Sequence, residues 1–136
     1  MELKTSYKPR LQDIQHAKEV LRGVIYDTPL QRSFSLSDRY KSNIYLKRED
    51  TQIVRSYKIR GAYNKIQSIK PQKLKHGVVC ASAGNHAQGV AFACKKLATN
   101  CTIFMPVTTS HQKIDQVRMF GGEFVHVELI GDSYDD

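Results

Sequence analysis

The sequence predicts an α/β protein built on an open, twisted, parallel sheet with helices on both faces. From residue 43 onward, short apolar segments alternate with longer amphipathic ones, a pattern typical of βαβ units. Proline or glycine stands where most of these segments end. A chain of 136 residues that is 40% hydrophobic and 25% charged is long and apolar enough to bury one real core.

The N-terminal half is expected to contain three helices and one strand. Apolar residues recur at intervals of three and four in the first helix, and the turn that follows it is extended because Pro29 biases Thr28 away from the helical region. A short helix and an apolar strand come next. Ser56 can cap the third helix, and Pro71 closes it. In chain order these elements are expected over residues 10–24, 35–40, 43–47 and 56–69.

The C-terminal half is expected to alternate strand and helix. Pro106 stops its second strand, and Gly121 with Gly122 stops its last helix. A further helix is expected to begin at Asp132 or Ser133, which leaves an αβ unit unfinished and suggests a truncated chain. The complete elements are expected over residues 77–81, 85–98, 101–105, 112–120 and 123–127.

Composition and charge narrow the class of protein. No apolar run reaches the length of a membrane span, and residues 1–9 do not resemble a signal peptide, so a cytoplasmic protein without a membrane partner is expected. The net charge of +8 permits nucleic-acid binding, but the basic residues form no block or recognition motif. All 21 lie at or before Arg118, whereas five of the 13 acidic residues follow it. This uneven distribution of charge favours the interpretation that the chain is one part of a larger molecule over the interpretation that it binds nucleic acid.

The three cysteines indicate neither a disulfide framework nor a metal site. Cys80, Cys94 and Cys101 give an odd count without CxxC spacing. They are expected to be buried free thiols in a reducing compartment. Their spacing to His86 and His111 does not fit a zinc site, so no bound metal is expected.

The first candidate functional residue is Lys58, at a predicted loop-to-helix junction. The partial positive charge of a helix N-terminus disfavours an added cation, and Arg55 and Arg60 act in the same direction if they lie close by. Such a position favours a reactive, deprotonated amine. An ordinary solvated lysine remains the alternative, because the chain contains 21 basic residues.

The second candidate is the turn at residues 82–86, between a predicted strand and a predicted helix. Gly84 lets the backbone approach a ligand closely, and the free amides of the helix start, with Ser82 and Asn85, can bind a carboxylate or phosphate. The alternative is that Ser82 and Asn85 only cap the helix. Neither a Walker A motif nor GxGxxG is present.

Together these two segments resemble those of the threonine dehydratase group of pyridoxal phosphate enzymes, which has the tryptophan-synthase-β-like fold (fold type II). Lys-Arg-Glu-Asp and Ser-Tyr-Lys-Ile-Arg-Gly-Ala-Tyr-Asn, around Lys58, are similar to the group's cofactor-lysine segment. Ser-Ala-Gly-Asn-His-Ala-Gln-Gly, from Ser82, resembles its substrate and cofactor loop. Further matches extend the resemblance over most of the chain: Thr28-Pro29-Leu30, Met105-Pro106 and Gly131-Asp132.

The resemblance implies a role for each matching residue. Lys58 would bind pyridoxal 5′-phosphate through its amine and later act as the base at the substrate Cα. Asn85 would hydrogen-bond the ring oxygen of the cofactor, and Tyr57, at a position that is often Phe in the family, would lie beside the ring. The substrate carboxylate would be held by Ser82, Ala83, Gly84, Asn85 and His86.

The implied reaction is a β-elimination that converts L-threonine to 2-oxobutanoate and ammonia, in isoleucine and branched-chain amino acid biosynthesis or in threonine breakdown. A serine racemase or serine dehydratase of the same fold is the near alternative, and a non-catalytic truncated fragment is the other. The implied partners are a small amino-acid substrate and further copies of the enzyme in a homo-oligomer, with no nucleic acid.

The resemblance also implies two domains and shows two departures. Residues 1–42 would belong to the larger domain of such an enzyme, and residues 43–136 would form its small α/β domain. The family usually carries Leu-Gln-Pro where this chain has Thr51-Gln52-Ile53. The glycine-rich phosphate loop of the family and its partner for the pyridine nitrogen both lie beyond position 136, so the isolated chain is expected to be inactive.

Overall fold

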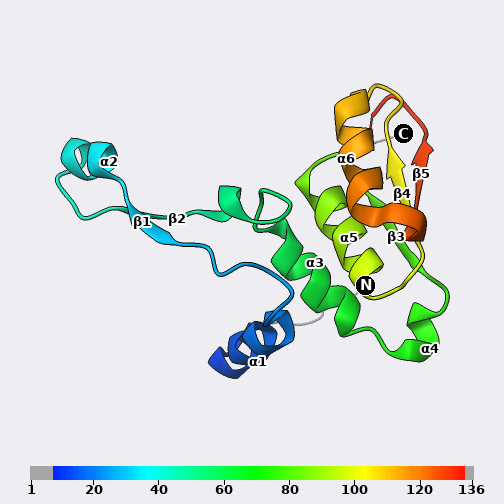
Figure 1. Ribbon diagram of the computed structural model, residues 1–136, viewed down its shortest axis with the longest axis horizontal. Coiled ribbons are helices and arrows are strands. Elements are labelled where there is room, and N and C mark those ends of the chain that lie inside the picture. The colour runs from blue at the N-terminus through cyan, green and yellow to red at the C-terminus, as the bar shows by residue number, and fades with distance from the viewer. Residues whose placement is uncertain (1–7, 134–136) are drawn as a thin grey trace, which may run out of the picture.

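The computed structural model describes residues 8–133. Figure 1 shows an α/β body and an arm that extends away from it. The body holds a parallel sheet with the strand order β3-β4-β5, and the predicted α/β fold is confirmed. The strands are β3 (Val78–Ala81), β4 (Cys101–Met105) and β5 (Val125–Leu129). The helices that connect them are α5 (Asn85–Lys96) and α6 (His111–Gly121).

Helices cover one face of this sheet within residues 8–133, whereas the sequence predicted helices on both faces. Ala87 and Ala91 of α5 share a buried core with Ile103 and Met105 of β4. On the opposite face Val79 is 72% exposed. The reason is topological. The strands follow one another in a single direction across the sheet, and successive right-handed crossovers then place both helices on the same side.

Helix α3 (Lys58–Gln67) packs along α5 and is the element that carries the candidate lysine. Its buried residues are Ile59, Ala62 and Ile66. On its other side, α1 (Leu11–Leu21) leaves a cavity of about 400 Å³ that both helices line. A short helix absent from the prediction, α4 (Pro71–Leu74), follows with proline in its first turn, where the missing N–H costs nothing.

The arm corrects the assignment of residues 43–47 to the parallel sheet. β1 (Leu30–Arg32) and β2 (Tyr45–Lys47) form a separate antiparallel pair, with Leu30 opposite Lys47, and α2 (Phe34–Arg39) connects them. The sequence predicted β2 within two residues but left β1 in a turn. A three-residue strand has too little periodicity to be recognised, and no local pattern identifies its partner.

Several predicted boundaries shift where the backbone turns. α1 ends at Leu21, three residues early, followed by Gly23 with a φ of 73°. β5 begins two residues late because η2 (Gly122–Phe124) forms a 3₁₀ turn before it. α5 and β4 begin as predicted. The helix expected from Asp132 or Ser133 would lie largely beyond the described residues.

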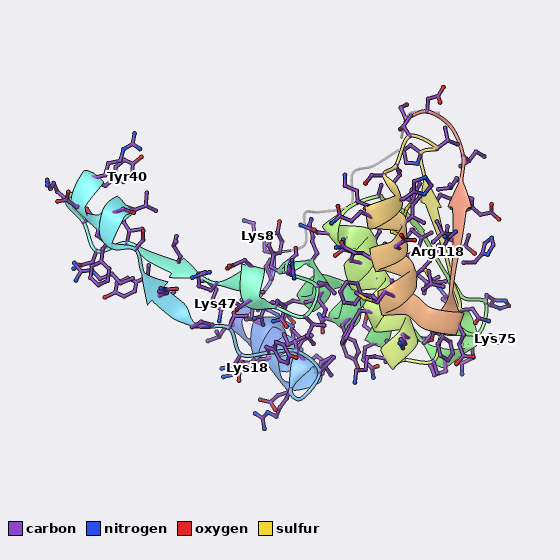
Figure 2. The ribbon with its side chains drawn as sticks, turned by 45° about the horizontal axis from the view of Figure 1, so that its top comes forward. Lys8, Lys18, Tyr40, Lys47, Lys75 and Arg118 are labelled. Atoms are coloured by element: carbon purple, nitrogen blue, oxygen red, sulfur yellow. The ribbon has the colours of Figure 1, made fainter. Side chains whose placement is uncertain are left out.

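Basic side chains are spread over the arm and the body. In Figure 2, Lys18 lies on α1, Lys47 on the arm and Arg118 on α6. Among residues 8–133, no helix has the length and apolar character that a bilayer span requires. The same part of the chain places no three His, Cys, Asp or Glu residues so that they could hold a metal ion.

The three cysteines are free and buried, as the sequence predicted. Burial raises the pKa of Cys80 to about 11. A hydrogen bond between the thiols of Cys94 and Cys101 lowers the pKa of Cys94 and raises that of Cys101. These residues belong to the hydrophobic core between the sheet and its helices.

Candidate functional site

Lys58 is the first residue of α3, and a tight loop precedes it. Arg55 adopts a φ of 53°, in the left-handed region, and its amide donates to the Gln52 carbonyl at 2.8 Å. The loop places Ser56 so that its hydroxyl accepts a hydrogen bond from the Lys58 amide at 3.2 Å. The predicted cap at Ser56 is wrong, because the helix begins two residues later and its N-cap residue is Tyr57; Ser56 supports the loop before the helix instead.

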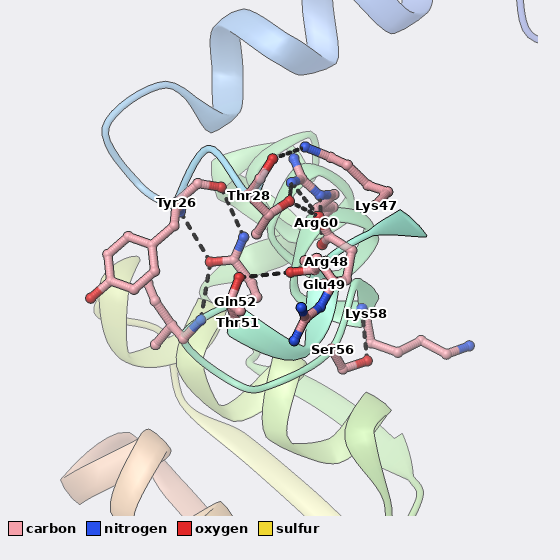
Figure 3. A network of polar contacts seen from close by, with 11 residues as sticks. Tyr26, Thr28, Lys47, Arg48, Glu49, Thr51, Gln52, Ser56, Lys58 and Arg60 are labelled. Carbon is pink, nitrogen blue, oxygen red and sulfur yellow. Dashed lines mark hydrogen bonds and ion pairs between the residues drawn. The ribbon is translucent and has the colours of Figure 1, made fainter. Parts of the chain in front are cut away.

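The side chain of Lys58 projects into open space (Figure 3). Its Nζ lies 5.4 Å from the centre of the Tyr57 ring, within the range of a cation–π contact. Tyr57 is itself 61% exposed. The amine and the aromatic face are therefore adjacent and both accessible to a planar ligand.

A polar network holds the base of α3 on the side away from the Lys58 amine (Figure 3). The Glu49 carboxylate accepts two hydrogen bonds from Arg60, at 2.9 Å from Nε and 2.7 Å from Nη2. The Thr28 hydroxyl donates to the same carboxylate at 2.5 Å. Lys47 adds a hydrogen bond from its ammonium to the Thr28 carbonyl. Because Arg60 is paired with Glu49, its charge is neutralised and not directed toward Lys58 as the sequence suggested.

Gln52 joins the same loop to the chain before the arm. Its side-chain oxygen accepts from the Tyr26 amide at 3.0 Å, and its side-chain nitrogen donates to the Tyr26 carbonyl at 2.9 Å. The Gln52 oxygen also accepts from the Ile53 amide at 3.1 Å. The family resemblance implies proline at the position of Ile53, and this hydrogen bond satisfies the N–H that proline would lack.

The turn at residues 82–86 opens α5 without a side-chain cap. Gly84 is the N-cap residue, and neither Ser82 nor Asn85 caps the helix. The Ser82 hydroxyl instead accepts from the Gly84 amide at 3.4 Å. The first N–H groups of a helix have no partner within it, so they are available to an anion. Simple capping of α5 by Ser82 or Asn85 is therefore wrong, and the anion site stays a prediction.

Gly89 brings the two candidate segments together. A Cβ built on Gly89 would lie 3.1 Å from both the Ile59 nitrogen and the Lys58 carbonyl carbon. Only glycine allows α5 and α3 to pack this closely. Asn85 lies four residues before Gly89, on the same face of α5, so that face leads from the turn to the backbone of Lys58.

The remaining predicted residues lie close by. Ala83 and Gly84 are half-buried in the turn, and Asn85 and His86 are exposed. His86 also lines a cavity of about 460 Å³ between α3 and the outer edge of β3. All of the predicted site residues thus lie at the N-terminal ends of α3 and α5 or in the turns that precede them.

The sequence analysis gave no role to Glu49, Thr28 or Gln52, which hold the lysine-bearing segment in place. Glu49 and Thr28 belong to the matching motifs, but their partners lie 11 and 21 residues away along the chain. The signal in the sequence is the charged run at residues 47–50 after an apolar strand. That signal marks an unusual segment without naming its partners.

The Glu49 network predicts an acid-sensitive contribution to stability. The hydrogen bonds from Arg60 hold the pKa of Glu49 below its ordinary value of 4.5. A group with a depressed folded-state pKa contributes stability above its unfolded pKa, and this contribution is lost as the pH falls through the folded pKa. We expect Glu49→Gln to lower the urea midpoint at pH 7 and to approach the parent protein below about pH 4. A stability difference that stayed constant from pH 7 to pH 3 would contradict this assignment.

The site fits the reactive end of pyridoxal phosphate. An accessible amine can bind the aldehyde, and the exposed Tyr57 ring lies beside that amine. A Cβ built on Gly84 would meet no atom within 4 Å, which leaves space above the uncapped start of α5. The chemistry and accessibility of these groups agree with the cofactor that the sequence implied.

Comparisons with known proteins place the whole arrangement in one family. Residues 21–136 match the family described as pyridoxal-phosphate dependent enzyme. The chain is 56% identical over 129 residues to the biosynthetic L-threonine dehydratase of Halalkalibacterium halodurans, which covers 95% of this chain and 31% of the relative. It is 52% identical over 134 residues to the enzyme of the same name from Bacillus subtilis, which covers 98% of this chain and 32% of the relative.

Solved structures agree with these matches. Processed threonine deaminase isoform 2 from Solanum lycopersicum superposes with a TM-score of 0.75 and 41% identity, over 93% of this chain and 38% of that one. Maize serine racemase superposes with a TM-score of 0.85 and 29% identity, over 95% of this chain and 38% of that one. The chain spans about a third of the length of the curated relatives it matches, at 31% and 32%. The match over residues 21–136 shows that the chain belongs to the pyridoxal-phosphate dependent enzyme family.

Proposed function

We propose that this chain provides the cofactor lysine and the substrate-binding turn of an L-threonine dehydratase, which releases 2-oxobutanoate and ammonia. The observation that carries the proposal is the close packing at Gly89, which joins the backbone of Lys58 to the helix that Asn85 begins. The names of relatives 52–56% identical to this chain support the choice of threonine.

Each residue contributes a separate task in this proposal. Lys58 holds pyridoxal phosphate through Nζ and later removes the proton from the substrate Cα. Tyr57 flanks the cofactor ring, and Asn85 donates a hydrogen bond to the ring oxygen. Once bound, the cofactor supplies the electron sink that makes the Cα proton acidic and lets the β-hydroxyl leave.

The turn before α5 orients the substrate. Its amides, together with the Ser82 hydroxyl, hold the carboxylate, and the positive end of the α5 dipole favours that negative charge. The residues assigned to this task are Ser82, Ala83, Gly84, Asn85 and His86. Fixing the carboxylate aligns the Cα–H bond with the lysine base, which is the main benefit of positioning.

The arm spans the boundary of the proposed domains, because β1 and β2 pair across it. Leu30, Phe34 and Tyr45 are 65%, 76% and 52% exposed on a ribbon that lies away from the body. A two-stranded ribbon is marginal alone and needs a surface to pack on. In our proposal residues 1–42 belong to a larger domain of the enzyme, and residues 43–136 form the small domain. The enzyme is a cytoplasmic homo-oligomer that takes part in isoleucine biosynthesis.

A chimera tests the function directly. Replacing the matching N-terminal third of the Bacillus subtilis relative with this chain is expected to give threonine-dependent release of 2-oxobutanoate. The chain alone is expected to give none, since the relatives are about three times as long. A chimera that folds and binds pyridoxal phosphate but leaves threonine unchanged would overturn the proposed function.

Serine racemase activity is the second candidate, because maize serine racemase gives the higher TM-score of 0.85. The same chimera, supplied with L-serine, separates the two reactions. A racemase forms D-serine, whereas a dehydratase forms pyruvate and ammonia. We expect the keto acid to dominate, because sequence identity is higher to the relatives named L-threonine dehydratase, at 56%, than to maize serine racemase, at 29%.

A further inference from the structure

We propose that Glu49, Arg60 and Thr28 form a positioning device that sets the orientation of the first turn of α3 and thereby the direction of the Lys58 amine. This inference rests on the cofactor role proposed for Lys58. It assigns a function to three residues that are not themselves expected to touch cofactor or substrate. The supporting observations are the geometry of the network, its burial and its place relative to Lys58 on the helix.

The first observation is that the network is strong and shielded. Arg60 binds the Glu49 carboxylate in a bidentate manner, at 2.7 and 2.9 Å, and Thr28 occupies Oε1 as well. The Glu49 side chain is only 14% exposed and that of Arg60 is 31% exposed. A bidentate pair fixes orientation as well as distance, unlike a single contact between flexible charged chains.

The second observation is the angle between the Arg60 and Lys58 side chains around the axis of α3. Arg60 follows Lys58 by two residues within the first turn of α3, so the two side chains leave the helix about 200° apart. Figure 3 shows the Arg60 side chain within the network and the Lys58 side chain directed away from it. Holding Arg60 on one side of the helix therefore points Lys58 out of the other.

The third observation is that the opposite side of α3 is already fixed. The backbone of Lys58 and Ile59 lies so close to Gly89 of α5 that an added Cβ would be 3.1 Å from it. Burial of Ile59, Ala62 and Ile66 limits the translation and rotation of α3 as a whole, whereas the exposed Lys58 lies in its first turn, where a further constraint can act. The Glu49 network supplies that constraint, through Thr28 from the segment before β1 and Glu49 from the turn after β2.

The chain offers a closely matched control. Asp50 is adjacent to Glu49 and also forms a bidentate pair, with Arg48, at 2.6 and 2.8 Å. That pair is more exposed and includes no residue of α3. Asp50→Asn therefore removes one carboxylate charge and one ion pair from the same turn without releasing the helix.

The test measures how readily Lys58 reacts with the cofactor in the intact protein. The amine and the aldehyde of pyridoxal phosphate condense with loss of water, and borohydride reduces the C=N bond to a stable secondary amine. Peptide mass spectrometry then compares labelling at Lys58 with labelling at Lys65, an exposed lysine on the same helix. The ratio of the two removes effects of concentration and general reactivity.

We expect Glu49→Gln to lower the Lys58-to-Lys65 labelling ratio by about tenfold or more, because small misplacements of reacting groups cost large factors in rate. Asp50→Asn is expected to leave the ratio within about twofold of the parent protein. In the active chimera, Glu49→Gln should lower kcat with little change in KM. Equal ratios for Glu49→Gln and the parent, or equal losses in the two variants, would overturn the proposal.

Milder variants decide the question if Glu49→Gln does not fold. Thr28→Val removes one hydrogen bond at nearly constant volume, and Arg60→Lys keeps the charge but loses the bidentate contact. Circular dichroism confirms folding before labelling. The proposal requires Arg60→Lys to lower the ratio more than Thr28→Val, and it fails if both variants label like the parent. Labelling needs no threonine turnover, so this outcome is independent of whether the protein is a dehydratase.

Discussion

Replacing Lys58 with alanine is expected to abolish threonine turnover in the chimera, with a loss of about 10⁴-fold or more. Two contributions disappear together: the covalent attachment point of the cofactor and the base that takes the Cα proton. A positioned base alone is worth about 10² to 10⁴-fold. The fold should remain intact, because the Lys58 side chain is exposed and contacts the exposed Tyr57 ring, not the core.

The measurement is 2-oxobutanoate release, together with the visible absorption of the protein after addition of pyridoxal phosphate. The parent chimera should gain a band that Lys58→Ala lacks, and thermal unfolding should show the same midpoint for both. Lys65→Ala, on the same helix, serves as the control and should keep both the band and the turnover. Persistence of the band in Lys58→Ala would place the cofactor on another lysine and remove the basis of the proposed site.

Gly89→Ala is expected to damage both stability and turnover, because the added Cβ would lie 3.1 Å from backbone atoms of Lys58 and Ile59. Backbone cannot move aside as a flexible side chain can, so α3 must shift away from α5. Overpacking of this kind costs about 1–3 kcal/mol. The shift that this contact requires is a few tenths of an ångström, and misplacement of the proposed catalytic lysine is expected to lower turnover by up to about 10²-fold.

Gly61→Ala provides the matched comparison for Gly89→Ala. Gly61 lies in α3, and a Cβ built there would meet no atom within 4 Å. Alanine in an open helical position stabilises by about 0.4–1 kcal/mol relative to glycine. The urea midpoint and the 2-oxobutanoate release of Gly61→Ala should therefore rise or stay at the parent level. Both quantities should fall in Gly89→Ala. A Gly89→Ala protein as stable and active as Gly61→Ala would show that the close contact is unimportant.

Local patterns were sufficient for most elements of the α/β body. Each strand of the parallel sheet is short, apolar and bounded by turn residues, and the start of α5 follows its glycine-containing turn. Lys58 and Asn85 were recognisable for the same reason, since each belongs to a contiguous segment whose residue types carry the chemistry. Periodicity and motifs depend on residues that are close together in the sequence, so they can be recognised without knowledge of the fold.

The arm and the network were not predictable in this way. β1 offers three residues, and its pairing with β2 depends on a connection that includes α2. Glu49 finds Arg60 11 residues onward and Thr28 21 residues back. Nothing in a charged run of sequence distinguishes a carboxylate held by arginine from one that faces water. The distinction exists only after distant segments have met.

The amino-acid sequence by itself determined the kinds of elements, the parallel sheet and the two segments that carry the Lys58 amine and the turn proposed to bind an anion. Only the tertiary structure decided that both crossover helices lie on one face of the sheet, that Gly89 admits the backbone of Lys58, and that Glu49 holds Arg60. The physical reason is the distance along the sequence over which each interaction acts. Helix and strand preferences come from residues within a few positions of one another, whereas the direction of a catalytic side chain depends on contacts that form when the chain packs together.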